Sequence, residues 1–218
     1  MTWLSPAFPV GAFTYSHGLE WAVEDGTVTS SAALTAWLSD ILCHGAGRSD
    51  AILLVTAFRA ASEERTKDLF EVAEFAYALQ PSKERRLESG AQGRAFVTAI
   101  ADTWGAPTLV DLAGRLAPNP VAYPVAVAVA AADHQLPLAE TVEAYLTAFA
   151  ANLVSAAVRA VPLGQTEGQR AIRDLVPVIS AVAADALLAS PDDLGGACLR
   201  ADIASMAHET QYTRLFRS

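Results

Sequence analysis

The 218-residue sequence predicts an all-α protein, a single-domain bundle of roughly eight to ten helices. Apolar residues recur at spacings of three and four through most of the chain, which is the period of an amphipathic helix. The alternation of apolar and polar residues that marks a half-buried strand is nearly absent. Helix-start signals separate the periodic stretches, and neither an internal repeat nor a long linker divides the chain. We therefore expect one helical domain.

Three helices are expected in the first part of the chain, and a capped fourth follows them. Weak helical patterns occupy residues 30–44 and 49–61. The next helix is predicted to begin at an N-cap on Thr66 and to end before Pro81, around a stripe formed by Leu69, Val72, Ala73, Ala76 and Leu79. Ser82 then caps the following helix.

The middle of the chain contains one ambiguous and one clear pattern. Residues 121–133 are so rich in alanine and valine that they fit either a helix or a buried strand. A long apolar stripe that starts near residue 138 predicts a helix ending before Pro162.

Two capping motifs begin the last helices. Thr166 and Gln169 form a predicted capping box for a helix that Pro177 should kink. The segment Ser190-Pro191-Asp192-Asp193 restarts a helix, because it combines an N-cap, a first-turn proline and two carboxylates near the positive end of the helix dipole.

Composition narrows the class of partner and the compartment. Hydrophobic residues make up 52% and charged residues 18% of the chain, which is apolar for a soluble protein and suggests a partner or an oligomer. The net charge of -9 disfavours a phosphate backbone, so nucleic acid is excluded as a partner. Two cysteines and the absence of a signal-peptide pattern indicate a reduced cytoplasmic setting. Charged residues interrupt the longest apolar helix, so we expect no membrane segment.

Signatures of catalysis and of cofactor binding are missing. The chain has no Gly-x-Ser-x-Gly elbow, no Walker-type loop and no dinucleotide-binding glycine motif. None of its four histidines has a second histidine or a cysteine three or four residues away. We expect a protein that is not an enzyme, binds no cofactor tightly and builds no metal site of its own.

A proline- and glycine-rich segment at residues 5–20 is the first of three polar constellations in apolar surroundings. It is either a rigid cap over the core or a functional surface that carries Tyr15, His17 and Glu20.

The second constellation is Arg86, Ser89 and Gly93, which share one narrow face of a helix. A helix crossing within the chain explains this face as well as a subunit interface does.

In the third constellation, Arg159 shares a helix face with asparagine and serine and leads into a glycine- and glutamine-rich loop. Gln165, Gln169 and Arg170 follow in this loop, which lies at a helix start and could receive an anion or contact a partner. A capped helix corner accounts for the same residues, and we favour it.

The C-terminal residues Met206–Ser218 have an unusual composition for a chain end. Termini are commonly small, polar and mobile, whereas this one contains the aromatic and arginine residues of binding hot spots. The tail therefore either folds back onto its own core or docks into a partner. We assign residues 1–205 to the helical domain and 206–218 to a docking tail whose candidate contacts are His208, Glu209, Gln211, Tyr212, Arg214, Leu215, Phe216 and Arg217.

Blocks of residues spread over nearly the whole chain resemble one known family, the urease accessory protein UreF, a helper in nickel insertion into urease. Any one block would be weak, but the ordered combination is specific. The blocks are Ser5-Pro6 with Pro9, Gly11, Phe13, Ser16 and Gly18-Leu19-Glu20; Glu84, Ser89 and Gly93; Tyr123-Pro124-Val125; Asn152-Leu153-Val154 with Arg159 and Pro162-Leu163-Gly164-Gln165; and His208-Glu209 with Gln211-Tyr212, Arg214-Leu215-Phe216 and Ser218.

This resemblance implies a UreF-like all-helical fold and a homodimer. It implies binding of a second accessory protein, called UreD or UreH, through surfaces that include the C-terminal tail. It further implies that the assembly recruits the GTPase UreG and helps transfer Ni²⁺ into apo-urease. Nickel would be handled by the complex, and the chain would act as a scaffold and not as a catalyst.

Two alternatives to the scaffold stay open. The first is a regulator of the GTPase, in which Arg159 or Arg170 reaches the partner's nucleotide as arginine fingers do. The second is a direct nickel carrier that uses the histidines.

Overall fold

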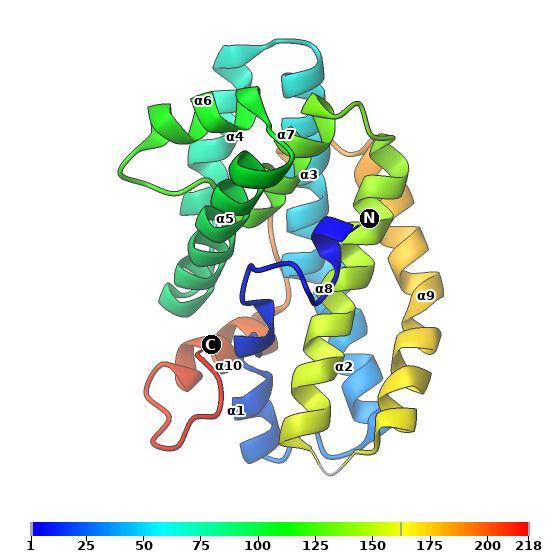
Figure 1. Ribbon diagram of the computed structural model, residues 1–218. Helices are drawn as coiled ribbons and strands as arrows, with labels where there is room; N and C mark the ends of the chain where they lie inside the picture. The colour runs from blue at the N-terminus through cyan, green and yellow to red at the C-terminus, as the bar shows by residue number, and fades with distance from the viewer. Residues whose placement is uncertain (1, 162, 218) are drawn as a thin grey trace.

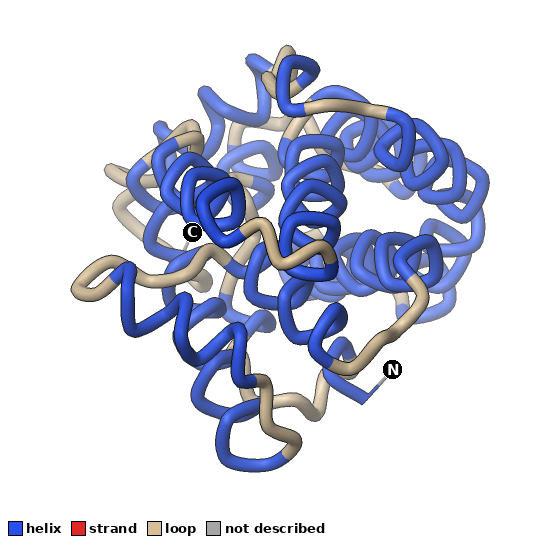
Figure 2. Tube along the Cα trace, turned by 90° about the horizontal axis from the view of Figure 1, so that it is seen from above, coloured by secondary structure: helices blue, strands red, loops and turns tan. Residues whose placement is uncertain are grey.

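Helices form the regular structure of the chain, which confirms the predicted all-α fold. The computed structural model describes residues 2–161 and 163–217, and every regular element within these ranges is helical (Figures 1 and 2). Pro162, expected just after the end of a helix, and Ser218, the last tail residue, lie outside the described residues. The elements are α1 (Leu19–Glu24), α2 (Ser31–His44), α3 (Ala46–Ser62), α4 (Thr66–Ala78), α5 (Lys83–Thr103), α6 (Pro107–Leu116), α7 (Tyr123–Asp133), α8 (Leu138–Ala160), α9 (Gln165–Leu188) and α10 (Leu199–His208), with 3₁₀ turns η1 (Thr2–Leu4), η2 (Ala12–Thr14) and η3 (Pro191–Asp193).

Most expected helices lie within a few residues of their predicted positions. This holds for α2, α3, α4 and α8. Ser82 is the N-cap of α5 as predicted, and its hydroxyl accepts the backbone N–H of Arg85 at 3.1 Å. The ambiguous segment 121–133 contains the helix α7.

Two predicted caps are one or two residues out of place. Thr66 is the first residue of α4 and not its N-cap, which is Arg65. Helix α9 begins at Gln165, with Gly164 as its N-cap, so the predicted Thr166 box is wrong. The carboxylate of Glu167 accepts the N–H of Gly164 at 2.9 Å and thereby fixes the earlier start.

The predicted helix start at Ser190 yields only the short turn η3. The Asp193 carboxylate accepts both the backbone N–H and the hydroxyl of Ser190, at 2.8 and 2.9 Å, which closes a single turn. The chain is then extended at Leu194 and takes a φ of 153° at Gly195. The next helix, α10, therefore begins later, at Leu199.

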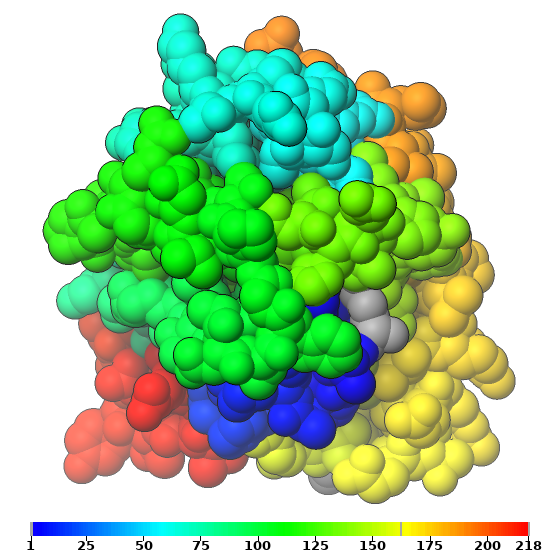
Figure 3. Space-filling view, turned by 45° about the horizontal axis from the view of Figure 1, so that its top comes forward, coloured from blue at the N-terminus to red at the C-terminus, as the bar shows by residue number. Residues whose placement is uncertain are grey.

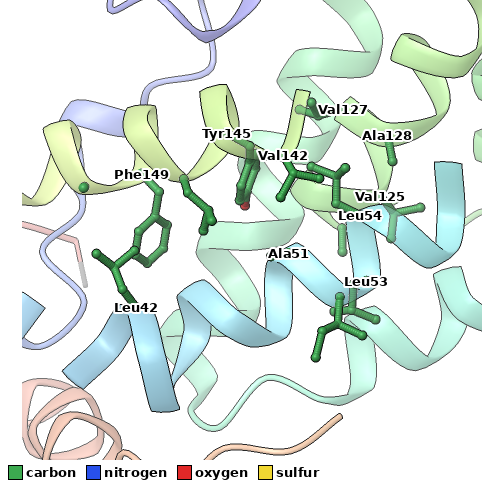
Figure 4. Packing of buried hydrophobic residues seen from close by; sticks show 14 of the residues in the cluster. Leu42, Ala51, Leu53, Leu54, Val125, Val127, Ala128, Val142, Tyr145 and Phe149 are labelled. Atoms are coloured by element: carbon green, nitrogen blue, oxygen red, sulfur yellow. The ribbon is translucent and has the colours of Figure 1, made fainter. Parts of the chain in front are cut away.

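Helix α3 lies at the centre of the bundle. It packs against α2, α4, α7, α8 and α9, and its residues 51–55 are all buried because neighbours surround it. Figure 4 shows Ala51, Leu53 and Leu54 of α3 among side chains from α2, α7 and α8.

Two helical stretches are long and apolar enough to cross a membrane by length and composition. They are residues 31–62, which span α2 and α3, and the helix α8. The share of each hydrophobic window that is buried inside the bundle is 61% and 56%. Core helices of soluble proteins pass the same test, and the packing places both stretches in the core.

The constellation on α5 is a crossing within the chain. The Ser89 hydroxyl accepts the backbone N–H of Tyr123 at 3.3 Å. A Cβ on Gly93 would lie 1.9 Å from the carbonyl oxygen of Val121, so backbone meets backbone and no side chain fits. The small residues are thus explained without a second subunit.

The last helix packs beside the first. Helix α10 contacts both α1 and α5, and it lies next to the N-terminal segment in Figure 1. Gly18 precedes α1 with a φ of 75°, and a Cβ there would lie 2.4 Å from the backbone nitrogen of Ser205. Glycine at this position lets the two chain ends approach closely.

Candidate partner-docking site

Helix α10 presents an apolar strip to solvent. Leu199, Ile203 and Met206 follow one another at i, i+4 and i+7, so they lie on one face, and their exposed fractions are 69%, 62% and 48%. The opposite face is buried in the bundle through Ala201, Ala204, Ser205 and His208. An outward face made of large apolar residues is the opposite of an ordinary surface helix, so this strip is a candidate interaction surface.

Beyond α10 the chain turns back, and the C-terminal residues (red) lie beside the N-terminal segment (blue) in Figure 3. The backbone N–H of Arg217 donates to the carbonyl of Thr14 at 2.8 Å. The Phe216 side chain is only 5% exposed, and the Arg159 guanidinium lies over its ring, 4.5 Å from the centroid. The same guanidinium donates to the carbonyl of Phe13 at 2.6 Å. The tail is therefore folded onto its own chain.

The folded tail leaves two large side chains outside. Tyr212 is fully exposed and Leu215 is 71% exposed. Together with the strip on α10 they form what we call the C-terminal apolar surface: Leu199, Ile203, Met206, Tyr212 and Leu215.

A buried ionic group, the His208 cluster, lies beneath this surface. His208 is fully buried, and its Nδ1 lies 2.7 Å from Glu84 Oε2 while its Nε2 lies 3.1 Å from Glu20 Oε2. Arg214 donates to the other oxygen of Glu84 at 3.0 Å. Four ionisable side chains from α1, α5, α10 and the tail thus meet in one place.

The carboxylate of Glu20 holds the tail backbone directly. It accepts the N–H of Leu215 at 2.7 Å and the N–H of Phe216 at 3.1 Å. These two amides belong to an irregular segment that has no helix to satisfy them, so the carboxylate replaces the missing secondary structure.

A second buried ionic group, the Glu88 cluster, joins the N-terminal segment to α5, α3 and α8. Arg85 lies 2.5 Å from both Glu88 and the Nε2 of His17, and Asp50 accepts the hydroxyl of Tyr145 at 2.8 Å. Burial alone would raise the pKa of Glu88, but Arg85 above all, with His17, lowers it to about 2. Burial raises the pKa of Asp50 to about 6, against the opposing effects of Arg85 and Tyr145. Burial and then Arg85 lower the pKa of His17.

A cavity of about 350 Å³ adjoins the Glu88 cluster. Its walls come from the N-terminal segment, which contributes Val10, and from α8, which contributes Phe149 and Asn152. The prolines and glycines of the N-terminal segment shape this wall.

The eight tail candidates come together, but they divide into two groups. His208, Gln211 and Phe216 are buried within the chain, where they position the tail; Gln211 donates to the Glu24 carboxylate. Glu209 is half-buried and accepts the backbone N–H of Lys83 at 3.0 Å. The exposed members are Tyr212, Arg214, Leu215 and Arg217.

The N-terminal candidates are buried. Tyr15, His17 and Glu20 are 8%, 8% and 7% exposed, which fits the rigid-cap interpretation of their segment. Their contact with a GTPase stays a prediction.

The candidates near the α8–α9 corner do not act as one group. Gln165, Gln169 and Arg170 are exposed at the start of α9, whereas Arg159 is engaged with the tail. A role for these residues at a GTPase also stays a prediction.

Sequence reasoning missed part of this site. Leu199 and Ile203 were not among the candidates, although their spacing with Met206 was visible in the sequence. Arg85 and Asp50 also escaped notice, and Glu84 was named only in a block that resembles the family, because nothing local signals that these charges are buried. In the described part of the chain, nowhere do three or more His, Cys, Asp or Glu side chains gather so that they could hold a metal ion.

Comparison with known proteins supplies the family context. The family model described as UreF matches residues 28–176. Proteins named urease accessory protein UreF from Rhodopseudomonas palustris (strain BisA53) and Bradyrhizobium diazoefficiens are 52% and 51% identical to the chain. The alignments cover all of this chain and 91% and 90% of those relatives. A protein of the same name from Methylobacterium sp. (strain 4-46) is 50% identical, with 87% of its length covered.

Proposed function

Because the chain belongs to the UreF family of urease accessory proteins, we propose that it is a scaffold that joins a UreD/UreH-type accessory protein to a UreG-type GTPase. In this proposal the assembled complex delivers Ni²⁺ to apo-urease in the cytoplasm. Nickel is cargo of the complex and not a resident cofactor of this chain. The chain contributes binding surfaces and no catalytic group, and it works as a homodimer.

The observation that carries the proposal is the C-terminal apolar surface. An exposed apolar face on a tightly packed helix is costly in water and is stabilised when a partner covers it, by about 25 cal/mol per Å² of apolar area before ordering costs. Tyr212 is the strongest candidate anchor, because tyrosine combines a large apolar ring with a polar tip and is enriched at hot spots. We assign this surface to the UreD/UreH-type partner.

The surroundings of the surface support docking with little rearrangement. Glu20 and Arg159 fix the backbone and the buried Phe216 of the tail before any partner arrives. A pre-ordered surface loses less conformational entropy on binding than a disordered peptide does. Arg159 therefore has a positioning role in the tail, and this role accounts for it without a catalytic one.

Deletion of residues 209–218 tests the proposal. We expect the shortened chain to lose co-purification with a UreD/UreH-type partner, because Tyr212 and Leu215 are removed. Its far-ultraviolet circular dichroism should stay helical, since the deletion begins after the last residue of α10.

A surface variant far from the tail serves as the control. Leu188 at the end of α9 is 89% exposed, and Leu188→Ala should leave co-purification unchanged. Retention of the partner by the shortened chain at wild-type yield would refute the proposed docking site.

A further inference from the structure

The environment of His208 constrains its protonation state. The side chain has no exposed surface, and each ring nitrogen faces a carboxylate oxygen. A neutral imidazole carries one N–H and can donate to only one of these oxygens. The other nitrogen would then direct a lone pair at a carboxylate in a fully buried site, which is unfavourable.

The remaining contacts show that the two carboxylates act as acceptors. Both oxygens of Glu20 receive backbone N–H groups, from Leu215 and Phe216. Glu84 receives the guanidinium of Arg214. Ionised carboxylates and an imidazolium satisfy all of these contacts at once, and the four side chains then carry two positive and two negative charges.

We propose that His208 is held as an imidazolium between Glu20 and Glu84, and that this proton fixes the C-terminal tail in the shape that presents Tyr212 and Leu215. The inference rests on the proposed docking function and adds a regulator to it, namely the proton. His208 is a positioning residue that acts through Glu20.

The direction of the effect follows from proton linkage. Histidine is the side chain whose ordinary charge change falls between about pH 5 and 8. Closing the tail around the cluster takes up a proton wherever the open form has lost it, so closure is favoured as pH falls and weakened as pH rises.

Other charged groups near the His208 cluster also contribute to the balance of charge around it. Glu24 of α1 accepts a hydrogen bond from Gln211, and Glu209 accepts the backbone N–H of Lys83, so both of these neighbouring carboxylates are engaged and add negative charge. Loss of the His208 proton would leave Arg214, which is half-exposed, as the cation in contact with Glu84, one of the two buried carboxylates. This imbalance favours opening of the tail.

Amide hydrogen exchange of the free protein tests the inference without any partner. The rates of residues 209–217, corrected for the intrinsic effect of pH, are compared at about pH 6 and about pH 8.5. We expect protection of the Leu215 and Phe216 amides to fall by about tenfold or more across this range, as linkage to one proton allows.

Two variants distinguish an effect of the His208 proton from an effect of side-chain packing. In His208→Gln the change in protection with pH should disappear, whereas His44→Gln, at an exposed histidine at the end of α2, should keep it. Equal wild-type protection at both pH values, or an unchanged pH effect in His208→Gln, would overturn the inference.

A direct measurement covers the case in which His208→Gln does not fold. The ¹⁵N chemical shifts of the wild-type His208 ring at about pH 6.5 report its protonation, and a neutral ring would overturn the inference. Co-purification of the partner with the tail deletion is a separate measurement. Failure of the proposed docking function would therefore appear in that experiment, whereas failure of the proposed role of the His208 proton would appear in hydrogen exchange or in the ring shifts.

Discussion

Replacing Glu88 with glutamine is expected to lower the free energy of unfolding by about 3 kcal/mol or more. Glu88 is 3% exposed and pairs with Arg85, which is 5% exposed. Glutamine keeps the volume but removes the charge, so a buried guanidinium loses its closest counter-ion. The loss should appear as a lower urea midpoint with an unchanged slope.

Two further variants test whether the buried charge is the cause of that loss. Glu74→Gln, on the exposed face of α4, should change the free energy of unfolding by less than about 0.5 kcal/mol. Replacing Arg85 and Glu88 together with methionine and leucine should restore much of the stability, because neither member of the pair is then left as a buried charge without the other. A loss below about 1 kcal/mol in Glu88→Gln would show that the buried pair is not a major source of stability.

The second large effect is expected at Asp50, through pH. The pKa of this carboxyl is raised from 3.8 to about 6 in the folded protein. Between these values the folded state keeps a proton that the unfolded state has lost, so stability falls as pH rises from about 4 to about 6. Over this pH range, Asp50 alone should lower the free energy of unfolding by about 3 kcal/mol.

Glu88 acts with the opposite sign at lower pH. Its folded pKa of about 2 lies below the ordinary 4.5, so its contribution is present above about pH 4.5 and is lost as pH falls toward 2. Stability therefore falls below about pH 4.5 through Glu88 and above about pH 4 through Asp50. Together the two groups place the highest free energy of unfolding near pH 4 to 5.

Asp50→Asn should remove the pH dependence of the free energy of unfolding that Asp50 causes and leave that of Glu88 in place. The asparagine carbonyl can still accept the Tyr145 hydroxyl, so the hydrogen bond survives. We expect the variant to exceed the wild type in free energy of unfolding by about 1 to 3 kcal/mol at about pH 7.5 and to lose that advantage near pH 4. Asp111→Asn on α6, at an exposed carboxyl, is the matched control. Equal gains at both pH values would contradict the assigned cause.

The sequence was sufficient for the helices because local periodicity determines them. The stripes on α4 and α8 and the Ser82 cap all arise from residues within a few positions of one another. Prediction failed at three helix starts. Thr66 begins α4 and does not cap it. Glu167 fixes an earlier start of α9, and Asp193 closes a single turn at Ser190 that does not continue into α10.

The buried charges could not be found in the same way. Helix α5 begins with a run of charged residues that reads as a solvated face, yet Glu84, Arg85 and Glu88 are buried. Their partners include His17 and His208, which lie 71 and 124 residues away from Glu88 and Glu84. No local pattern encodes such contacts, which are set only when the two chain ends meet.

In the tail, the sequence indicated one feature and left another undetermined. Its composition distinguishes it from an ordinary chain end, but composition does not separate residues that hold the tail from residues that face outward. Phe216 and Tyr212 are both aromatic candidates, and the structure buries the first while exposing the second.

The most direct measurement of the central claim is the affinity of a purified UreD/UreH-type partner for the double variant Tyr212→Asp, Leu215→Asp. Both side chains are exposed, so the fold and the His208 cluster should persist. The matched control is Val176→Asp, Leu188→Asp on α9, where both residues are also exposed. Our account predicts that the tail variant binds about 100-fold more weakly and that the control binds as the wild type does. Wild-type affinity of the tail variant, with weakened binding by the α9 variant, would contradict it.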